Sequence, residues 1–254
     1  MAEARYIYCI VASPQKVRLG KIGLDGNRVY TIPYQDISAV VHDCNAKPYE
    51  SKDSEEVKNW VITHEKVVET TWGRLGTVLP FGFDTIIKAD KDKGAEEVVI
   101  DWIKEDYQNL REKLHKVKGK AEYGVQVSWD TKFISQLLTG KDEELEKLSE
   151  EIKSKPKGVA YMYKQKLEKI LRGKLEKEAE IYFKEFYERI KECTEDIRVE
   201  KLKKEEEPWQ MLMNVSCLAF KKDVEVLGDE LDKINSREVF SVRFTGPWPP
   251  YSFV

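Results

Sequence analysis

The chain has 254 residues, of which 41% are hydrophobic and 35% are charged, and 43 basic residues nearly balance 46 acidic ones. A chain of this length forms one large domain or two ordinary ones, and its apolar fraction is sufficient for a buried core. The formal net charge of -3 provides no general basic field for a nucleic-acid backbone. Sequence-independent binding of DNA or RNA is therefore disfavoured.

Targeting and redox signals are absent from the sequence. No stretch approaches the roughly 18 consecutive apolar residues of a membrane span, and no secretory signal stands at the N-terminus, so a cytoplasmic protein is expected. The four cysteines are widely separated and form no C-x-x-C pair. This spacing supports neither a zinc ribbon nor a thioredoxin-like motif.

The first half of the chain predicts strands mixed with two helices. Apolar residues recur with a period near 3.6 between Asp53 and Trp72, which indicates a helix, and Gly73 and Gly76 are expected to end it. A second apolar stripe indicates a helix that breaks at Gly119. The expected strands lie at 5–13, 28–32, 37–42, 77–83 and 86–87, and the expected helices at 53–72 and 95–117.

The second half combines strands with a densely charged segment. Apolar residues recur every three or four positions from Leu167 to Ile197, which predicts a single long helix at about 159–200. Its charges are interpreted as a solvated face, with the apolar stripe packed on a sheet; a coiled-coil seam is the alternative. The other expected elements are strands at 123–129, 209–220 and 238–245 and short helices at 133–138 and 224–234.

This order of elements predicts an α+β fold in two domains. Residues 1–120 are expected to form an N-terminal α+β domain, in which a sheet packs with two helices. Residues 121–254 are expected to form a ferredoxin-like domain that carries the long charged helix.

A search for catalytic chemistry finds no site. His64-Glu65 begins like the H-E-x-x-H zinc motif, but Val68 stands where the second histidine is required. No phosphate-binding loop and no G-x-S-x-G serine motif is present. We therefore expect no catalytic, cofactor-binding or metal-ligating residues. His64 itself is interpreted as a hydrogen-bonded core histidine, with partner contact and catalysis as alternatives.

The most specific segment is the C-terminal tail from Arg243 to Val254. Its three prolines stiffen the backbone, so that Trp248, Tyr251 and Phe253 are presented at low entropic cost. Two interpretations remain open. The tail packs back on its own domain and locks the final strand, or it offers its aromatic side chains to an apolar partner.

The ending T-G-P-W-P-P-Y-S-F closely resembles the terminal signature of the gas vesicle F/L protein family. Further stretches resemble that family in the family's own order. Near Pro80 the family commonly reads P-x-R-F-G, whereas Phe81-Gly82-Phe83 here contains no arginine. The other resembling stretches are Tyr6–Val11, His64-Glu65 with Val68, Val78–Phe83 with Thr85, Tyr123–Val127 and Met211–Phe220.

The resemblance implies a minor accessory component of gas vesicles, the gas-filled flotation organelles of some bacteria and archaea. It implies an α+β N-terminal domain, a ferredoxin-like C-terminal domain and no catalytic residues. The implied partners are the small hydrophobic shell protein and other gas vesicle accessory proteins, and the implied location is the gas vesicle. The candidate partner-contact or family-signature residues are His64, Pro80, Phe81, Phe83, Arg243, Thr245, Gly246, Pro247, Trp248, Pro249, Pro250 and Tyr251.

We therefore expect a non-enzymatic protein that binds the shell protein and aids vesicle assembly or nucleation. A small-ligand module or an enzyme on a ferredoxin-like scaffold is the alternative, which a deep polar pocket around His64 or His42 would favour. RNA binding through Tyr6 and Tyr8 is a third hypothesis. It requires those two rings to be exposed on a sheet face.

Overall fold

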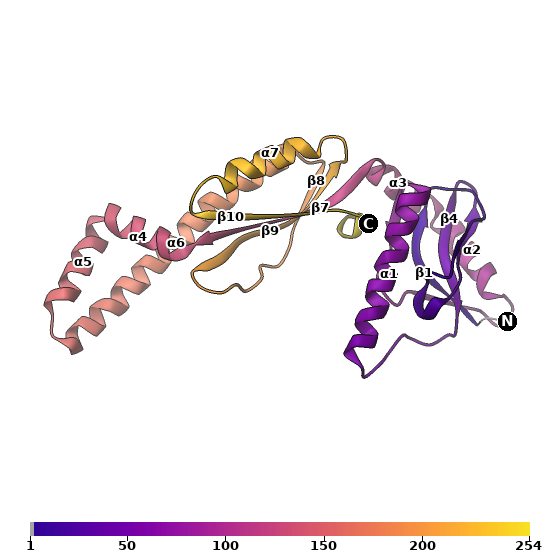
Figure 1. Cartoon of the computed structure of the whole chain (residues 1–254), viewed down its shortest axis with the longest axis horizontal. Helices are drawn as coiled ribbons and strands as arrows, with labels where there is room; N and C mark the ends of the chain where they lie inside the picture. The colour runs from indigo at the N-terminus through magenta and orange to yellow at the C-terminus, as the bar shows by residue number, and fades with distance from the viewer. Residues whose placement is uncertain (1–2) are drawn as a thin grey trace. The chain divides into compact units, whose positions relative to one another are not determined.

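The computed structural model describes residues 3–254, which contain seven α-helices and ten strands. The chain divides into two compact units: unit 1 comprises the chain up to residue 122 together with 247–254, and unit 2 comprises 123–246. The chain enters unit 2 within β7 (Lys120–Asp130) and leaves it within β10 (Phe240–Trp248) (Figure 1). We expected residues 247–254 to belong to the C-terminal domain, whereas in the structure they belong to unit 1.

Unit 1 is built on an antiparallel sheet with β1 at its centre. The strand order is β2-β3-β4-β1-β5, and β6 pairs with β1 beside β5. Nearly every residue of β1 is buried, which explains why this strand reads as a continuous apolar run in the sequence. The strands are β1 (Ala4–Val11), β2 (Arg18–Gly20), β3 (Val29–Tyr34), β4 (Ile37–Cys44), β5 (Val78–Pro80) and β6 (Ile86–Lys88).

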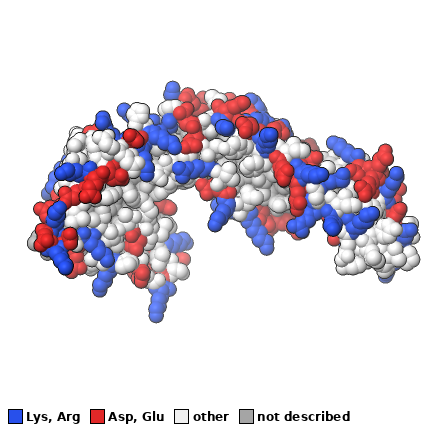
Figure 2. Space-filling view, turned by 180° about the vertical axis from the view of Figure 1, so that it is seen from behind, with Lys and Arg blue, Asp and Glu red and all other residues white. Residues whose placement is uncertain are grey.

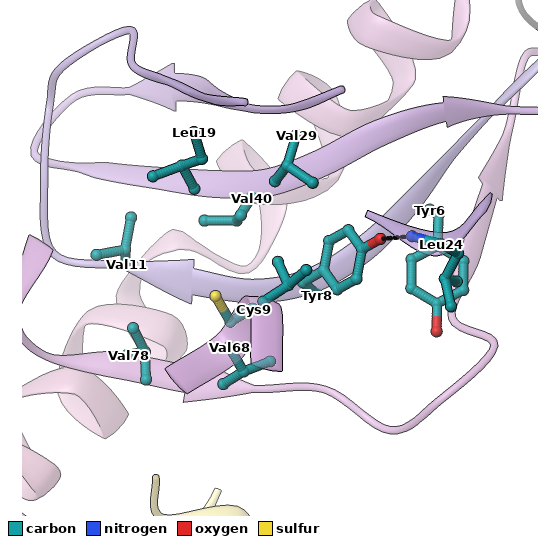
Figure 3. Packing of buried hydrophobic residues seen from close by; sticks show 11 residues of the cluster. Tyr6, Tyr8, Cys9, Val11, Leu19, Leu24, Val29, Val40, Val68 and Val78 are labelled. Carbon is teal, nitrogen blue, oxygen red and sulfur yellow. Dashed lines mark hydrogen bonds between the residues drawn. The ribbon is translucent and has the colours of Figure 1, made fainter. Parts of the chain in front are cut away.

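A β-bulge in β1 shapes the core of unit 1. The register between β1 and β4 shifts between Ile7 and Cys9, so Tyr8 is an extra residue in the strand. Because of this shift, Tyr6, Tyr8 and Cys9 all join one buried cluster, which Figure 3 shows together with Val68 of α1 (Ser54–Leu75). The short 3-10 helix Leu24–Gly26 adds Leu24 to the same cluster.

The helices of unit 1 have clear boundary signals. The Asp53 carboxylate accepts a hydrogen bond from the Glu55 N–H at 2.9 Å and caps α1, which ends at Gly76 with φ 89°. The single helix expected at 95–117 is wrong. Two helices, α2 (Ala95–Glu105) and α3 (Tyr107–Val117), meet at Asp106, whose backbone leaves the helical conformation and whose carboxylate binds the Asn109 side-chain amide.

Unit 2 contains a four-stranded sheet with the order β10-β7-β9-β8, in which β8 and β9 are antiparallel. The long helix ends earlier than expected, and residues 196–199 form a strand instead. Ile197 fits the helical stripe in the sequence, but β8 pairs it with Cys217 of β9. The elements are α4 (Thr131–Lys141), α5 (Glu143–Ser154), α6 (Lys157–Glu192), β8 (Asp196–Val199), β9 (Trp209–Phe220) and α7 (Val224–Asn235).

Helix α6 packs against two different neighbours along its length. Near its C-terminal end, Phe186 and Ile190 are fully buried, and Phe186 contacts the Phe240 ring edge-on at a centroid distance of 4.9 Å. Its other half packs on α4 and α5, where Lys174 forms an ion pair of 2.5 Å with Asp142. The three helices make a hairpin-like extension of unit 2 (Figure 1). The apolar stripe of α6 therefore packs on the sheet at one end of the helix and on α4 and α5 at the other.

Candidate functional site

The residues that carry the family resemblance fall into three groups. His64, Pro80, Phe81 and Phe83 lie in or beside the core of unit 1, and residues 247–251 form a tail on the same unit. Arg243, Thr245 and Gly246 lie on β10 in unit 2. The first two groups share helix α1, which presents His64 to the core and Glu65 to the tail.

His64 is a core residue with only 2% of its surface exposed. Its Nδ1 lies 2.9 Å from the Tyr6 hydroxyl and its Nε2 lies 3.0 Å from the Phe81 carbonyl oxygen. The Phe81 carbonyl oxygen can only accept, so Nε2 carries a ring hydrogen and donates to it. In the neutral ring Nδ1 then accepts the hydrogen of the Tyr6 hydroxyl, whose oxygen accepts the Asp84 N–H. Burial lowers the pKa of His64, although the hydrogen bond to Phe81 acts in the opposite direction, so the imidazole is neutral at pH 7.

His42 repeats this arrangement on β4. Its Nδ1 lies 2.8 Å from the Tyr8 hydroxyl and its Nε2 lies 2.9 Å from the Tyr49 hydroxyl. The Tyr8 hydroxyl also accepts the Leu24 N–H at 3.0 Å, shown as a dashed line in Figure 3. Burial lowers the pKa of His42 from 6.5 to about 4. Both histidines are thus neutral, hydrogen-bonded members of the core.

These two histidines have no nitrogen available for a substrate. Each ring nitrogen already has a partner, and the ring of His42 stacks on Tyr6 at a centroid distance of 5.0 Å. A general base must reach the proton that it removes, and a buried, fully bonded imidazole does not. Their arrangement serves the packing of unit 1, and His64 offers a partner no accessible surface in this conformation.

The segment around β5 closes one side of this core. Pro80 ends β5, and Phe81 packs edge-on against Trp102 of α2 at 5.6 Å between centroids. Phe83 contacts the Tyr6 ring at 6.3 Å and the His64 ring at 6.2 Å. The resembling stretch at 78–83 is therefore a packing segment, in which the Phe81 carbonyl also fixes the tautomer of His64.

The C-terminal tail is anchored on unit 1 by its last residues. Ser252 donates two hydrogen bonds to the Glu122 carboxylate, from its N–H at 2.8 Å and from its hydroxyl at 2.7 Å. Phe253, in the 3-10 helix Tyr251–Phe253, is buried. Trp248 remains 46% exposed and Tyr251 remains 36% exposed. The tail therefore packs on unit 1, and not on the C-terminal domain as expected from the sequence, while two of its aromatic rings remain partly exposed.

A small groove lies between the tail and α1. We call it the tail groove, and its volume is about 260 Å³. The groove is lined by Glu65, Glu69, Glu122, Trp248, Pro249 and Tyr251. Burial raises the pKa of Tyr251, and the neighbouring carboxylates Glu65 and Glu69 raise it further. The tail groove therefore combines aromatic walls with a negative electrostatic potential.

The residues of β10 have a local structural role in unit 2. The Thr245 hydroxyl donates to the Gly124 carbonyl at 3.4 Å, and a Cβ atom on Gly124 would lie 2.7 Å from that hydroxyl oxygen. A Cβ atom on Gly124 would therefore force the Thr245 side chain to move. Gly246 has φ 118°, a conformation that favours glycine, and Arg243 is exposed.

Several residues of these arrangements were not expected from the sequence. Tyr6 and Tyr8 are fully buried, so the hypothesis that they stack RNA bases is wrong. Their pairing with His42 and His64 had no sequence signal, because 34 and 58 residues separate the partners. Glu65 and Glu69 were visible only as an acidic pair four positions apart on a predicted helix. The Ser252 to Glu122 anchor spans 130 residues.

Two classes of site find no support in the described residues. Among residues 3–254, no group of three or more histidine, cysteine, aspartate or glutamate side chains is arranged to hold a metal ion. Nor does any helix in that range combine the length and low charge that crossing a bilayer requires.

Comparison with known proteins identifies the family. The family model described as "Gas vesicle synthesis protein GvpL/GvpF" matches residues 4–254. The chain belongs to this family. Gas vesicle protein L1 of Halobacterium salinarum is 30% identical over 261 residues, which cover 100% of this chain and 91% of the relative. Gas vesicle protein F of a Nostoc species is 20% identical over 256 residues, which cover 100% and 98% of the two chains.

Solved structures of GvpF proteins share the fold. The crystal structure of GvpF from an Anabaena species aligns with a TM-score of 0.78 at 21% identity and covers 99% of this chain and 98% of that one. GvpF from Microcystis aeruginosa aligns with a TM-score of 0.69 at 18% identity, covering 98% of each chain. This member of the GvpL/GvpF family thus shares with them a mixed fold of helices and antiparallel sheets.

Proposed function

We propose that this protein is a non-enzymatic accessory component of gas vesicles, which binds the small hydrophobic shell protein and aids vesicle assembly or nucleation. Membership of the GvpL/GvpF family supports a role in gas vesicles. In this proposal the protein works in the cytoplasm, at the forming or finished gas vesicle. Other gas vesicle accessory proteins are further partners.

The observation that carries the proposed binding is the exposed apolar surface of the α4–α6 extension. Tyr161 is 62% exposed and Met162 is 70% exposed, although both are large apolar side chains on one helix. Exposed apolar surface of this kind is typical of interaction sites, and methionine adapts its shape to varied apolar partners. The other large exposed apolar residues of this extension are Phe133, Leu137, Val159 and Ile181.

The charges around this surface suit a carrier for an apolar protein. Basic and acidic side chains are intermixed on the face drawn in Figure 2 rather than separated by sign. Such a surface keeps a protein dispersed while an apolar patch binds its partner. We infer that the extension contacts the shell protein and that its charged neighbours limit uncontrolled association.

The direct test is co-purification with the shell protein. The double variant Tyr161→Ser/Met162→Ser removes the two most exposed apolar side chains of α6 and should reduce recovery of tagged shell protein by about fivefold or more. Lys166→Ser/Glu168→Ser, at exposed polar positions of the same helix, is the matched control and should leave recovery unchanged. Equal recovery with both variants would contradict binding through this surface. No recovery with the unchanged protein would contradict the proposed function itself.

We also infer that unit 2 is ferredoxin-like and that the two units are two domains, which meet within β7 near residue 120. The order β7, α4–α6, β8, β9, α7 and β10 follows the β-α-β-β-α-β pattern of that fold, with the first helix expanded into three. The sheet order β10-β7-β9-β8 places the first and last strands side by side, as this pattern requires. Separate expression of 123–246 tests the inference, since an autonomous domain should unfold cooperatively.

A further inference from the structure

The tail groove of unit 1 contains negative charge that the described residues leave unbalanced. Glu65 and Glu69 are exposed and lie four positions apart on α1, and no ion pair joins either of them to another residue between 3 and 254. Like charges at this spacing destabilise a helix. In the isolated chain this arrangement brings no stabilising contact, so it favours a cation supplied from outside.

Two aromatic rings stand beside these carboxylates. Trp248 and Tyr251 line the tail groove and remain 46% and 36% exposed. Their backbone is held in place, because the buried Pro249 lies between them and Ser252 is bonded to Glu122. The faces of tryptophan and tyrosine rings attract cations. The fixed tail thus presents a prepared aromatic surface at the edge of a negative field.

The size of the groove selects its occupant. Its volume of about 260 Å³ lies below the range of about 300–1,000 Å³ that is typical of small-molecule pockets. One long side chain fills such a space. An apolar side chain would remove water from Glu65 and Glu69 without replacing their hydrogen bonds, and an acidic one would be repelled. A basic side chain donates hydrogen bonds to the carboxylates and places its positive charge against the faces of the rings.

We propose that the tail groove binds an arginine side chain presented by a partner protein, with the guanidinium against Trp248 and Tyr251 and its N–H groups donating to Glu65 and Glu69. Arginine is favoured over lysine because its planar group stacks on aromatic rings and donates to a carboxylate through two parallel hydrogen bonds. The inference goes beyond the proposed function, because it concerns unit 1 and holds for whichever partner carries the arginine.

The test is a titration of the full chain with a defined probe. Acetyl-Gly-Arg-Gly-amide should shift the Trp248 indole N–H resonance with a millimolar dissociation constant, typical of one side chain acting alone. Trp248→Phe assigns that resonance among the six tryptophans. The same peptide with citrulline keeps the shape of arginine but has no charge, and it should bind at least about tenfold more weakly.

Variants separate the groove from general charge effects. Glu65→Gln/Glu69→Gln should weaken binding of the arginine peptide at least about tenfold, because both ion pairs are lost. Glu150→Gln/Glu151→Gln makes the same change of net charge on exposed residues of unit 2 and should leave binding unaltered. Each variant is first shown to be folded by its amide spectrum. Absence of a shift with the arginine peptide, equal binding of the citrulline peptide, or unchanged binding to Glu65→Gln/Glu69→Gln would overturn the proposal.

Discussion

The core of unit 1 and the α4–α6 extension of unit 2 differ in which side chains they bury and which they expose. In unit 1, polar groups are buried and almost completely satisfied: Tyr6 and Tyr8 each accept a backbone N–H while contacting a histidine ring. In the extension, large apolar groups such as Met162 remain in water. A satisfied polar network specifies one arrangement of its members. An exposed apolar surface is instead available for contacts with a partner.

The same contrast exists within α6. The helix has 36 residues, yet only Phe186 and Ile190, both near its C-terminal end, are fully buried. An ion-pair network involving Glu185, Arg189 and Glu230 joins that end to α7. One end of the helix therefore belongs to the stable body of unit 2, and the remainder depends on α4 and α5. Substitutions at the two ends of α6 should consequently change the free energy of unfolding by very different amounts.

The largest effect is expected at the buried end of α6. Phe186→Ala removes a fully buried ring that contacts Tyr182 and Phe240, and it should lower the free energy of unfolding by about 3–5 kcal/mol. Denaturant unfolding of the full chain measures this change. Ile181→Ala, on the same helix but 59% exposed, is the control. A similar loss in both variants would show that burial does not distinguish these positions.

Acid should destabilise unit 1 before unit 2. The folded pKa of His42 is about 4, below its ordinary value of 6.5, so the unfolded chain binds this proton more readily. The contribution of the neutral His42 to the free energy of unfolding is therefore fully present above pH 6.5. It is lost as the pH falls toward 4, by about 3 kcal/mol in total. His64 adds a loss in the same direction.

Unit 2 provides the internal control for this acid effect, because residues 123–246 include no histidine. Hydrogen exchange between pH 5 and 7 should show protection falling in β1 and β4 while β9 changes little. Parallel loss of protection in both units would contradict the assignment of neutral, buried histidines.

A smaller effect is expected from one hydroxyl of the network. Tyr8→Phe leaves the Leu24 N–H and the Nδ1 of His42 without their partner, and it should cost about 2 kcal/mol of stability. Tyr161→Phe removes an exposed hydroxyl that only accepts from Gln165 in α6. Thermal unfolding of the two variants side by side tests the difference. Equal midpoints would mean that the buried bonds contribute nothing net.

The smallest effect is expected at the exposed surface of α6. Met162→Ser changes a side chain that is 70% exposed, so the free energy of unfolding should stay within about 0.5 kcal/mol of its original value. Its effect should appear in shell-protein binding instead. A large loss of stability would place Met162 in the folded body and remove the contrast with Phe186.

Local signals predicted most elements, and long-range pairing explains what they missed. The strand expected at 209–220 is β9, and the period of α1 was clear because its buried residues repeat regularly. β8 was missed because Ile197 continues a helical spacing that only pairing with β9 overrides. The break at Asp106 was missed because apolar residues keep their period across it.

The candidate site was less predictable than the fold. The tail was recognised as the most specific segment, but its place on unit 1 depends on the bond from Ser252 to Glu122, which no periodicity encodes. The tail groove likewise joins residues 65 and 69 to residues 248–251. Side chains that meet across such sequence distances become neighbours only through the complete fold.

The anchor between Ser252 and Glu122 also has a consequence for the order of folding during synthesis. All of unit 2 lies between these two residues in the chain. A ribosome therefore completes unit 2 before it releases the segment that finishes unit 1. The α1 surface of unit 1 therefore stays open until residues 247–254 emerge and pack on it.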